Sequence, residues 1–407
     1  MEISELFYIG IAVFTGLIFG KLVKLIKLPN VTGYLIGGLI IGPSVLGKLG
    51  INIMPENAIE ELGYFSDIAL GFIAFTIGTN FQFDYFKRVG VKPIVIAIFE
   101  SLFAVVFVFV ALVIAGQNIE FSLLIAAIAS ATAPAATIMV IKQYKAKGET
   151  TETLMSVVAL DDAVALILFG FAVAISNAIS SQESSVVWGI IKPFIEVIAS
   201  LSIGMIMGVI LSFLLKWFTG RSNRIACIFS IILITASAPS LIGLVLPDFE
   251  ISSLLSCMMI GAVFCNMTPK YNINPIMELV DRFTPPILIM FFVMSGADLN
   301  LSILASIGLV GLIYVIFRVI GKMFGAWLGA LITKCSANVR NYLGLALVPQ
   351  AGVAIGLTVV AGNCVPQYAA QIRAIILCAT LIYELVGPAI SKFALTKAGD
   401  IKKEQKA

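Results

Sequence analysis

Two adjacent acidic residues and one lysine lie inside long apolar stretches of this sequence. Asp161 and Asp162 lie in the run VVALDDAVALILFG, and Lys322 lies in FRVIGKMFGAWLGA. If these runs are helices that cross a membrane, all three residues lie about eleven residues, or roughly 17 Å, from one end of the span. A carboxylate at that depth costs at least about 2.5 to 3.5 kcal/mol, so these side chains need a partner or a function.

Neighbouring residues on a helix point about 100° apart, so Asp161 and Asp162 face different surroundings. One of them can pair with Lys322 while the other faces a water-filled site. A purely stabilising ion pair is the less favoured interpretation, because a buried ion pair rarely repays its desolvation. A carboxylate in a low-dielectric site tends to hold a proton, and a cation at the same oxygen competes with that proton. Such competition is the chemistry of exchange.

Two prolines interrupt apolar runs near these charges. Pro134 in ATAPAAT and Pro349 in ALVPQAG lie in the middle of two predicted spans. A proline removes a main-chain hydrogen bond, and the freed carbonyls can face a cavity. Interrupted helices at equivalent places in two halves of a chain are the best sequence pointer to an ion site in a transporter.

The sequence therefore predicts an ion and proton site, because hard oxygen ligands suit an alkali cation. Its predicted members are Asp161, Asp162, Thr132 and Lys322, and the predicted Na⁺ ligands are Asp162, Asp161 and Thr132. The possible supporting residues are Ser130, Pro134, Pro349, Gln350, Arg318 and Glu384.

The other charges within spans are single residues. We expect Arg318, which lies one turn before the membrane lysine, to be held by one of the glutamates Glu100, Glu196 or Glu384 as a structural bridge. Glu100 and Glu196 are more simply structural. Glu384 lies in the span equivalent to that of the aspartate pair, which leaves its role open.

The composition sets the fold class. The chain has 407 residues, of which 60% are hydrophobic and only 12% are charged, and it contains no histidine. We expect an all-α polytopic membrane protein without a separate soluble domain, because the length is used up by membrane spans. The lack of histidine excludes histidine metal sites and triads. We expect no cofactor and no nucleic-acid partner, and we interpret the six isolated cysteines as small buried residues.

Long apolar runs broken by Gly, Pro and charge predict about 13 spans. The first run has Glu2 and Glu5 rather than a basic start, so it is expected to be a retained span and not a signal peptide. The predicted spans are 4–26, 31–50, 60–80, 93–116, 119–142, 150–179, 188–218, 223–246, 251–268, 283–299, 303–333, 339–363 and 367–396.

The basic residues predict the orientation. Of the 26 lysines and arginines, 21 fall in one set of alternate loops, and only Lys48, Lys192 and Arg373 fall in the other. Because basic residues favour the cytoplasmic side, the N-terminus is expected outside and the C-terminus inside.

The two halves of the chain also resemble each other. FIAFTIGTNFQF at 72–83 matches IMFFVMSGADLNL at 289–301, and the stretch from Gly38 matches that from Gly261. Each segment matches a segment that lies seven spans later. Because successive spans alternate in direction and seven is odd, the two halves cross the membrane in opposite directions. We expect two inverted six-helix repeats with crossed broken helices, joined by a linker helix at 188–218.

Taken together, SATAPAATIMV, VVALDDAVALILFG, FRVIGKMFGAWLGA, LGLALVPQAGVAIGL and IYELVGPAISKFAL resemble the sodium/proton antiporters of the monovalent cation:proton antiporter superfamily. The resemblance implies a homodimer in the cell membrane and an elevator-like movement. It further implies electrogenic exchange of about two protons per sodium ion, with a role in pH homeostasis. It makes Asp162 the ion and proton carrier, pairs Asp161 with Lys322, and adds Thr132 to the cation site.

On the same pattern, helices nearer a dimer interface are expected at 1–92 and 223–282, ion-translocating core helices at 93–180 and 283–396, the linker at 188–218, and a cytoplasmic tail at 397–407.

The sequence departs from the family pattern at two positions, and both departures reduce the polarity near the predicted ion site. Ala133 stands where many relatives have a polar or acidic residue, and Gln350 begins Gln-Ala-Gly where many have Arg-Gly-Glu. The order of preference among Na⁺, Li⁺ and K⁺ therefore stays open.

Other functions fit less of the sequence. A potassium/proton antiporter of the same fold would use the same carboxylate and carbonyl oxygens. A sodium-coupled symporter of organic anions would leave Lys322 without a role. An intramembrane enzyme would need a second aspartate motif besides Asp161-Asp162, and a passive channel would not need a titratable pair. We therefore expect a transporter and not an enzyme.

Overall fold

The computed structural model of the chain consists of helices and their connections, with no strand in the part it describes. The described residues are 5–25, 30–84, 90–133, 137, 140–141, 144–180, 186–244, 251–299, 308–350 and 352–401, and the side chains of 180, 186–190, 193, 352, 384 and 385 are not included.

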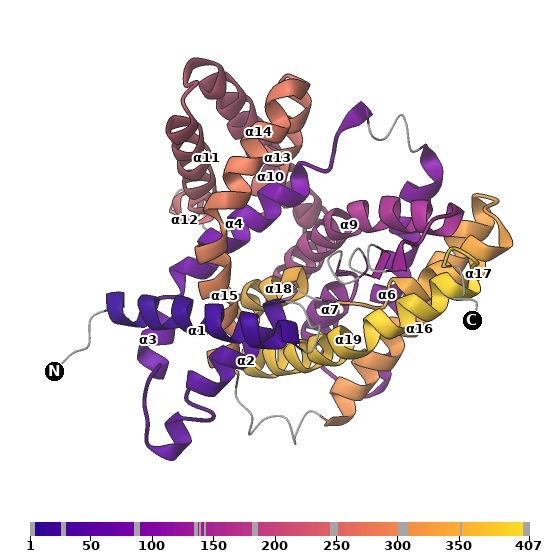
Figure 1. The fold of residues 1–407 in the computed structure, drawn as a ribbon, viewed down its shortest axis with the longest axis horizontal. Helices are drawn as coiled ribbons and strands as arrows, with labels where there is room; N and C mark the ends of the chain where they lie inside the picture. Colours follow the sequence, from indigo (N-terminus) through magenta and orange to yellow (C-terminus); the bar gives the residue numbers. More distant parts are fainter. Residues whose placement is uncertain are drawn as a thin grey trace.

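The helices follow one another as α1 (Glu5–Leu25), α2 (Asn30–Ile41), α3 (Glu56–Glu61), α4 (Tyr64–Gly78), α6 (Val91–Ile114), α7 (Ile119–Ile128), α9 (Glu149–Ser180), α10 (Val186–Trp217), α11 (Arg221–Ala236), α12 (Ala238–Gly243), α13 (Ser253–Met267), α14 (Lys270–Phe283), α15 (Pro285–Ala297), α16 (Gly308–Ile332), α17 (Ala337–Ala346), α18 (Gly352–Cys364) and α19 (Ala369–Lys397). Figure 1 shows α10 to α14 grouped at one side of the molecule and α16, α17 and α19 at the other.

Within the described residues, six helical segments are long and apolar enough to cross a membrane: 5–25, 91–114, 149–179, 194–217, 221–243 and 308–332. Six shorter apolar helices accompany them, including α2, α4, α7, α13 and α15. The outward side of α10 carries Ile198, Ile206 and Phe213, which are 63%, 61% and 59% exposed. Apolar side chains on an exposed surface of this extent suit a lipid environment and not water.

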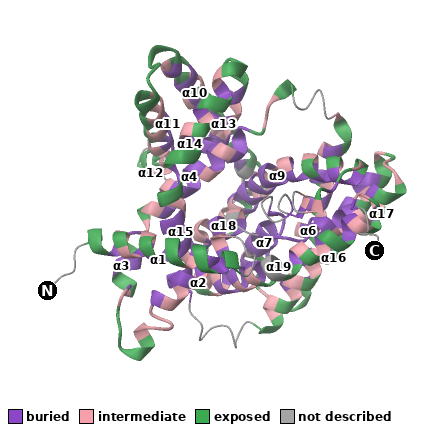
Figure 2. Cartoon of the chain, in the orientation of Figure 1, coloured by how far each residue is buried: buried purple, intermediate pink, exposed green. Residues whose placement is uncertain are grey.

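Buried residues concentrate where α6, α7 and α9 pack together, while the outer faces of α10 and α11 are exposed (Figure 2). Unlike the core of a soluble domain, this interior contains charged side chains. Glu100, Asp161, Arg318 and Lys322 are all fully buried. Buried charges of this number must be paired or hydrogen-bonded, so the interior is where a functional site is expected.

Glycines let several helix pairs approach to main-chain contact. A Cβ at Gly78 on α4 would clash with the Met258 carbonyl of α13, and one at Gly261 on α13 would clash with the Phe75 carbonyl of α4. Helices α2 and α15 show the same reciprocal contact, in which Gly38 faces the Val293 carbonyl and Gly296 faces that of Leu35. Small residues at such crossings are typical of packing in membranes. In addition, α15 packs on α1 and α4.

Two helices end inside the molecule, as the proline positions predict. Helix α17 ends at Ala346, residues 348–350 are non-helical, and α18 starts at Gly352, so the predicted break at Pro349 is confirmed. Helix α7 ends at Ile128 and is followed by non-helical residues 131–133. Pro134 itself lies outside the described residues.

The two irregular segments meet where the helices end. The Ala133 N–H donates to the Pro349 carbonyl over 2.9 Å, which fixes one crossing segment against the other.

Candidate ion-binding site

Helix α16 approaches α6 unusually closely. Gly321, Gly325 and Gly329 are spaced four residues apart along one face of α16, and a Cβ at Gly325 would clash with the main chain of α6 at Phe99 and Glu100. Small residues at this spacing let two main chains touch. Lys322, next to the first of these glycines, therefore projects directly into the interface with α6.

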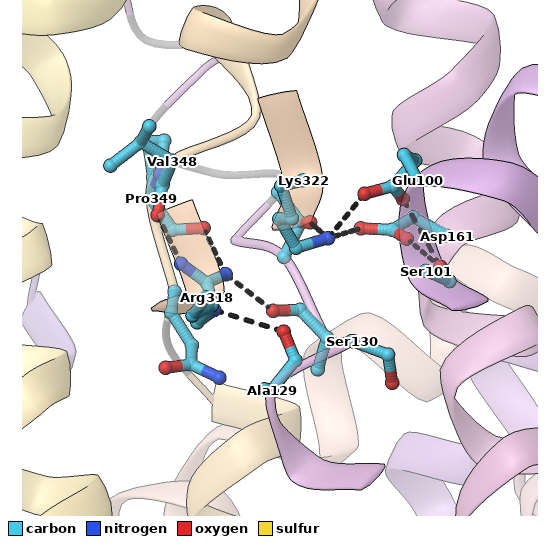
Figure 3. A network of polar contacts seen from close by, with 12 residues as sticks. Glu100, Ser101, Ala129, Ser130, Asp161, Arg318, Lys322, Val348 and Pro349 are labelled. Carbon is cyan, nitrogen blue, oxygen red and sulfur yellow. Dashed lines mark hydrogen bonds and ion pairs between the residues drawn. The ribbon is translucent and has the colours of Figure 1, made fainter. Parts of the chain in front are cut away.

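The ammonium group of Lys322 is surrounded by three oxygens (Figure 3). Lys322 Nζ donates to Glu100 Oε2 over 2.6 Å, to Thr132 Oγ1 over 2.7 Å and to Asp161 Oδ2 over 3.3 Å. The contact between Asp161 and Lys322 that the sequence predicts is therefore present, but Glu100 is the nearer carboxylate. The three donors of the ammonium group are all used.

Asp161 and Glu100 are also connected through a hydroxyl group. Ser101 Oγ lies 2.8 Å from Asp161 Oδ1 and 3.1 Å from Glu100 Oε1. Three helical or broken segments, α6, α9 and the segment after α7, thus supply oxygens around one lysine of α16.

Asp162 points elsewhere, as its position one residue further along α9 requires. Its side chain is buried, with 7% exposure, and Oδ1 has no hydrogen-bond partner among the described atoms. A buried carboxylate oxygen without a partner is costly unless a proton or a cation occupies it. Among the predicted site residues whose side chains are described, Asp162 has a buried carboxylate oxygen without a hydrogen-bond partner.

Arg318 stabilises the ends of the broken helices. Its guanidinium donates to the carbonyls of Ala129, Val348, Ala131 and Pro349 over 3.0, 2.7, 2.8 and 3.5 Å (Figure 3). It also lies over the Tyr383 ring, at 4.5 Å from the centroid. Carbonyls at the C-terminal end of a helix lack partners and carry a partial negative charge, and a cation satisfies both needs.

The expectation that a glutamate holds Arg318 is wrong for the described side chains. Glu100 binds Lys322 instead, and the described hydrogen bonds of Arg318 go to the main chain. The physical reason is that two helix ends converge on one face of α16, and a planar guanidinium with five donors fits several carbonyls at once.

The supporting residues have distinct positions. The Gln350 amide donates to the Ile128 carbonyl over 3.0 Å and exchanges hydrogen bonds with the hydroxyl of Tyr314, so it connects α7 to α16. Ser130 Oγ donates to the Ala127 carbonyl over 2.6 Å and closes the last turn of α7. The Glu384 side chain lies outside the described residues.

Within the described residues, no group of three or more acidic or sulfur side chains is arranged to hold a metal ion. The oxygens that the structure places near one another are those of Asp161, Thr132 and Glu100. All three contact the lysine.

The sequence did not predict the contact between Glu100 and Lys322. Glu100 lies nine residues from the start of α6, while Lys322 lies ten residues from the end of the antiparallel α16. Two buried opposite charges therefore share one depth in the bilayer. The depth of every charged residue within its span can be compared, and not only the depths in the spans that carry motifs. That comparison would have indicated the pair of Glu100 and Lys322.

The chain is similar to several known proteins. A family model described as "sodium/hydrogen exchanger, transmembrane" matches residues 9–397. A cation/H⁺ antiporter of Arabidopsis thaliana is 34% identical over 91 residues, which is 22% of this chain and 11% of that protein. The alignment thus covers about a tenth of the length of this relative.

Two structures of a sodium proton antiporter from Methanocaldococcus jannaschii have a similar fold. Each superposes with a TM-score of 0.73, at 19% and 18% sequence identity. The first covers 97% of this chain and 96% of the other, and the second covers 98% of both. At this level of identity the likeness concerns the fold.

Proposed function

The chain belongs to the sodium/hydrogen exchanger family, and on that premise we propose that it exchanges Na⁺ or Li⁺ for H⁺ across a membrane, with Asp162 as the carboxylate that both ions share. Its family and its structural neighbours are antiporters, and its apolar helices make it an integral membrane protein. In this proposal sodium is the transported substrate and not a resident cofactor.

The observation that carries the proposal is the buried Asp162 Oδ1, which has no hydrogen-bond partner among the described atoms and belongs to the residue next to Asp161. A carboxylate in this position needs either a proton or a cation to be stable. Occupation by one excludes the other. Release of a proton to one side can therefore be coupled to release of a cation to the other.

Access to the site requires that the molecule change shape. A cavity of about 300 Å³ lies between α9, α10, α13 and α18, and Phe169, Val173 and Asn177 of α9 line it. Phe169 lies seven residues, about two turns, beyond Asp162 on the same helix face. We propose alternating access by an elevator-like movement, in which this cavity is one of the two routes.

The remaining features of the proposal come from the resemblance and the charge distribution. The protein is proposed to be a homodimer in the cell membrane, with the N-terminus outside and the C-terminus in the cytoplasm. It is proposed to be electrogenic, with a role in pH homeostasis. The reciprocal glycine contacts support inverted repeats, because a repeat that relates α2 to α13 and α4 to α15 converts one contact pair into the other.

The test is proton movement in proteoliposomes on addition of Na⁺, Li⁺ or K⁺, with the membrane potential either clamped or free. Asp162→Asn should abolish the movement, because the amide neither releases a proton nor offsets the charge of a cation. Asp281→Asn makes the same chemical change at an exposed position of α14 and should leave exchange unchanged.

The cation series separates the alternatives. Movement on Na⁺ or Li⁺ that is lost in Asp162→Asn supports the proposal. Movement only on K⁺ would indicate a potassium/proton antiporter, and no movement on any cation would favour the organic-anion symporter. Full exchange in the Asp162→Asn protein would refute the assignment of the shared carboxylate.

A further inference from the structure

An apolar groove lies on the outer surface between α16 and α17, and none of the candidate ion-site residues line it. The two helices pack against each other (Figure 1), and the groove between them has a volume of about 370 Å³. Ile320, Phe324 and Trp327 of α16 line it, and these side chains are 43%, 39% and 39% exposed. In a membrane protein, apolar side chains that are exposed in this way face lipid. The groove is therefore open to the acyl chains of the bilayer.

The packing around the groove fixes its shape. Met323 and Gly344 both line it, and a Cβ at Gly344 would lie 2.7 Å from Cα of Met323, so α17 approaches the main chain of α16 there. The centroid of the Phe324 ring lies 5.0 Å from that of Phe103 and 6.1 Å from that of Trp327. Aromatic pairs at these separations attract each other, which holds the rings in place. The groove is thus built into the packing of the helices.

The groove also has a positive charge. Arg340 and Asn341, close to the start of α17, supply polar side chains to its lining. Arg340 is partly buried, and its Nε is buried without a hydrogen-bond partner among the described atoms. The ion pairs among the described residues do not include Arg340. A guanidinium that lies against the protein without a counter-charge attracts an anion, and its planar set of donors fits a phosphate group.

The two ends of the groove lie at different depths in the membrane. Arg340 is the fourth residue of α17, whereas Ile320 lies twelve residues before the end of α16, which is about 18 Å along the helix axis. In the predicted orientation Arg340 is near the cytoplasmic surface, where basic pockets between membrane helices bind anionic head groups. A polar head at the surface and an apolar chain that runs inward are the parts of a phospholipid.

Other occupants fit the groove less well. A free phosphate would use Arg340 and leave the apolar wall uncovered. A second copy of the chain is expected against the helices nearer the proposed dimer interface, and Figure 1 shows α10 to α14 on the other side of the molecule from α16 and α17. An acyl chain alone gains little over its neighbours, because lipid tails are as apolar as the wall itself. Selection of one lipid must therefore come from the charge of its head group.

We propose that an anionic phospholipid binds specifically in this groove, with its phosphate on Arg340 and one acyl chain along Trp327, Phe324 and Ile320. The lipid covers the outward face of the helix whose inward face carries Lys322. Binding of this lipid does not depend on ion exchange at Asp162, so the two proposals stand or fall separately.

The test is quenching of tryptophan fluorescence by brominated lipids. Trp188→Phe and Trp217→Phe leave Trp327 as the only tryptophan, since the chain has three. This protein is placed in phosphatidylcholine vesicles that contain a small fraction of brominated phosphatidylglycerol or, in parallel, of brominated phosphatidylcholine. We expect brominated phosphatidylglycerol to bind beside Trp327 about fivefold more strongly, which is the effect of one basic residue near the membrane surface.

In Arg340→Gln the two brominated lipids should quench equally, because the amide has no charge for the phosphate. Arg340→Lys should keep part of the preference, since an ammonium keeps the charge but not the planar fork. Arg221→Gln is the matched control, because Arg221 is an exposed arginine at the start of α11, on the same predicted side of the membrane. This control should keep the full preference.

Equal quenching by the two lipids before Arg340 is changed, or an unchanged preference in Arg340→Gln, would overturn the proposal. An equal loss in Arg221→Gln and Arg340→Gln would also overturn it, because the attraction would then come from the overall charge of the surface.

The melting temperature in detergent gives a second measurement on the chain with its native tryptophans. Phosphatidylglycerol should raise it more than phosphatidylcholine does, and the difference should disappear in Arg340→Gln. The same rise with inorganic phosphate alone would indicate a site for free anions and would contradict the lipid assignment. No difference between the two lipids in the native chain would contradict it as well.

Discussion

Arg318 and Lys322 lie one turn apart on α16 and bind different kinds of partner. The guanidinium of Arg318 contacts carbonyls from two helix ends, whereas the ammonium of Lys322 contacts side-chain oxygens. A rigid planar fork suits fixed main-chain dipoles, and a compact ammonium on a flexible stem suits side-chain oxygens that converge on one point. We interpret Arg318 as the residue that holds the crossing in place and Lys322 as the one that balances charge.

Arg318 is therefore expected to matter for stability. Arg318→Gln removes the cation and leaves several buried carbonyls without donors. The free energy of unfolding in detergent should therefore fall by at least about 3 kcal/mol. Arg318→Lys should restore only part of this, because an ammonium cannot reach both helix ends at once. The measurement is thermal or denaturant unfolding of the purified protein.

Arg282→Gln is the control for this experiment. Arg282 forms an exposed pair with Glu278 one turn earlier on α14, and such pairs contribute about 0.3 to 0.5 kcal/mol. If Arg318→Gln were no more destabilising than Arg282→Gln, the interpretation that Arg318 holds the two helix ends in place would be wrong.

The sequence predicted some of these contacts and not others, for a physical reason. Depth along a span can be counted from the ends of an apolar run, which placed Asp161 near Lys322 correctly. Rotation about the helix axis cannot be read from hydropathy when all sides of a helix are apolar. Arg318 was consequently assigned to a glutamate although its described hydrogen bonds go to main-chain carbonyls, and the contact between Glu100 and Lys322 was not predicted.

At the scale of elements, the break at Pro349 was predicted and an amphipathic helix was missed. The break at Pro349 followed from the chemistry of proline alone. In contrast, α14 lies where the hydropathy pattern predicts a connection between two spans. Its buried residues Ile273, Ile276 and Val280 recur with helical spacing, but a search for long apolar runs passes over an amphipathic helix.

The glycine contacts give a test at this scale. Gly78→Ala and Gly296→Ala place a methyl group against a main-chain carbonyl of the partner helix, so each should destabilise the protein by about 1 to 3 kcal/mol. Gly10→Ala on α1 meets nothing within 4 Å and should be neutral or stabilising by up to about 1 kcal/mol.

Equal sensitivity at Gly78 and Gly296 would support the inverted repeat, since the repeat makes these positions equivalent. A large effect at one and none at the other would argue against equivalent packing. Unfolding in detergent provides the comparison for all three variants.

At the scale of the whole molecule, composition alone predicted an all-helical membrane protein, and the fold confirms it. Within the described residues, six helical segments are long and apolar enough for a full span, and the bent pair at 366–397 makes a seventh if it is one span. Six other apolar helices are shorter, so the count of 13 spans stays a prediction. Short helices arise because broken spans, such as the one interrupted at Pro349, divide an apolar run into two pieces.

The predicted orientation can be tested directly in intact cells. In a variant whose six native cysteines are replaced by alanine, Lys48→Cys should react with an impermeant thiol reagent added outside, because Lys48 is exposed and is predicted to lie outside. Lys397→Cys, exposed at the end of α19, should react only after the membrane is opened. The reverse pattern would invert the topology.

Competition between a proton and a cation at Asp162 is the central claim, and binding tests it more directly than transport. Calorimetric titration of the detergent-solubilised protein with Na⁺ over a series of pH values should show affinity that falls as pH falls, by about tenfold per pH unit for each proton displaced. Binding should be lost in Asp162→Asn and kept in Asp281→Asn. Binding of Na⁺ that does not depend on pH, or that persists in Asp162→Asn, would contradict the account.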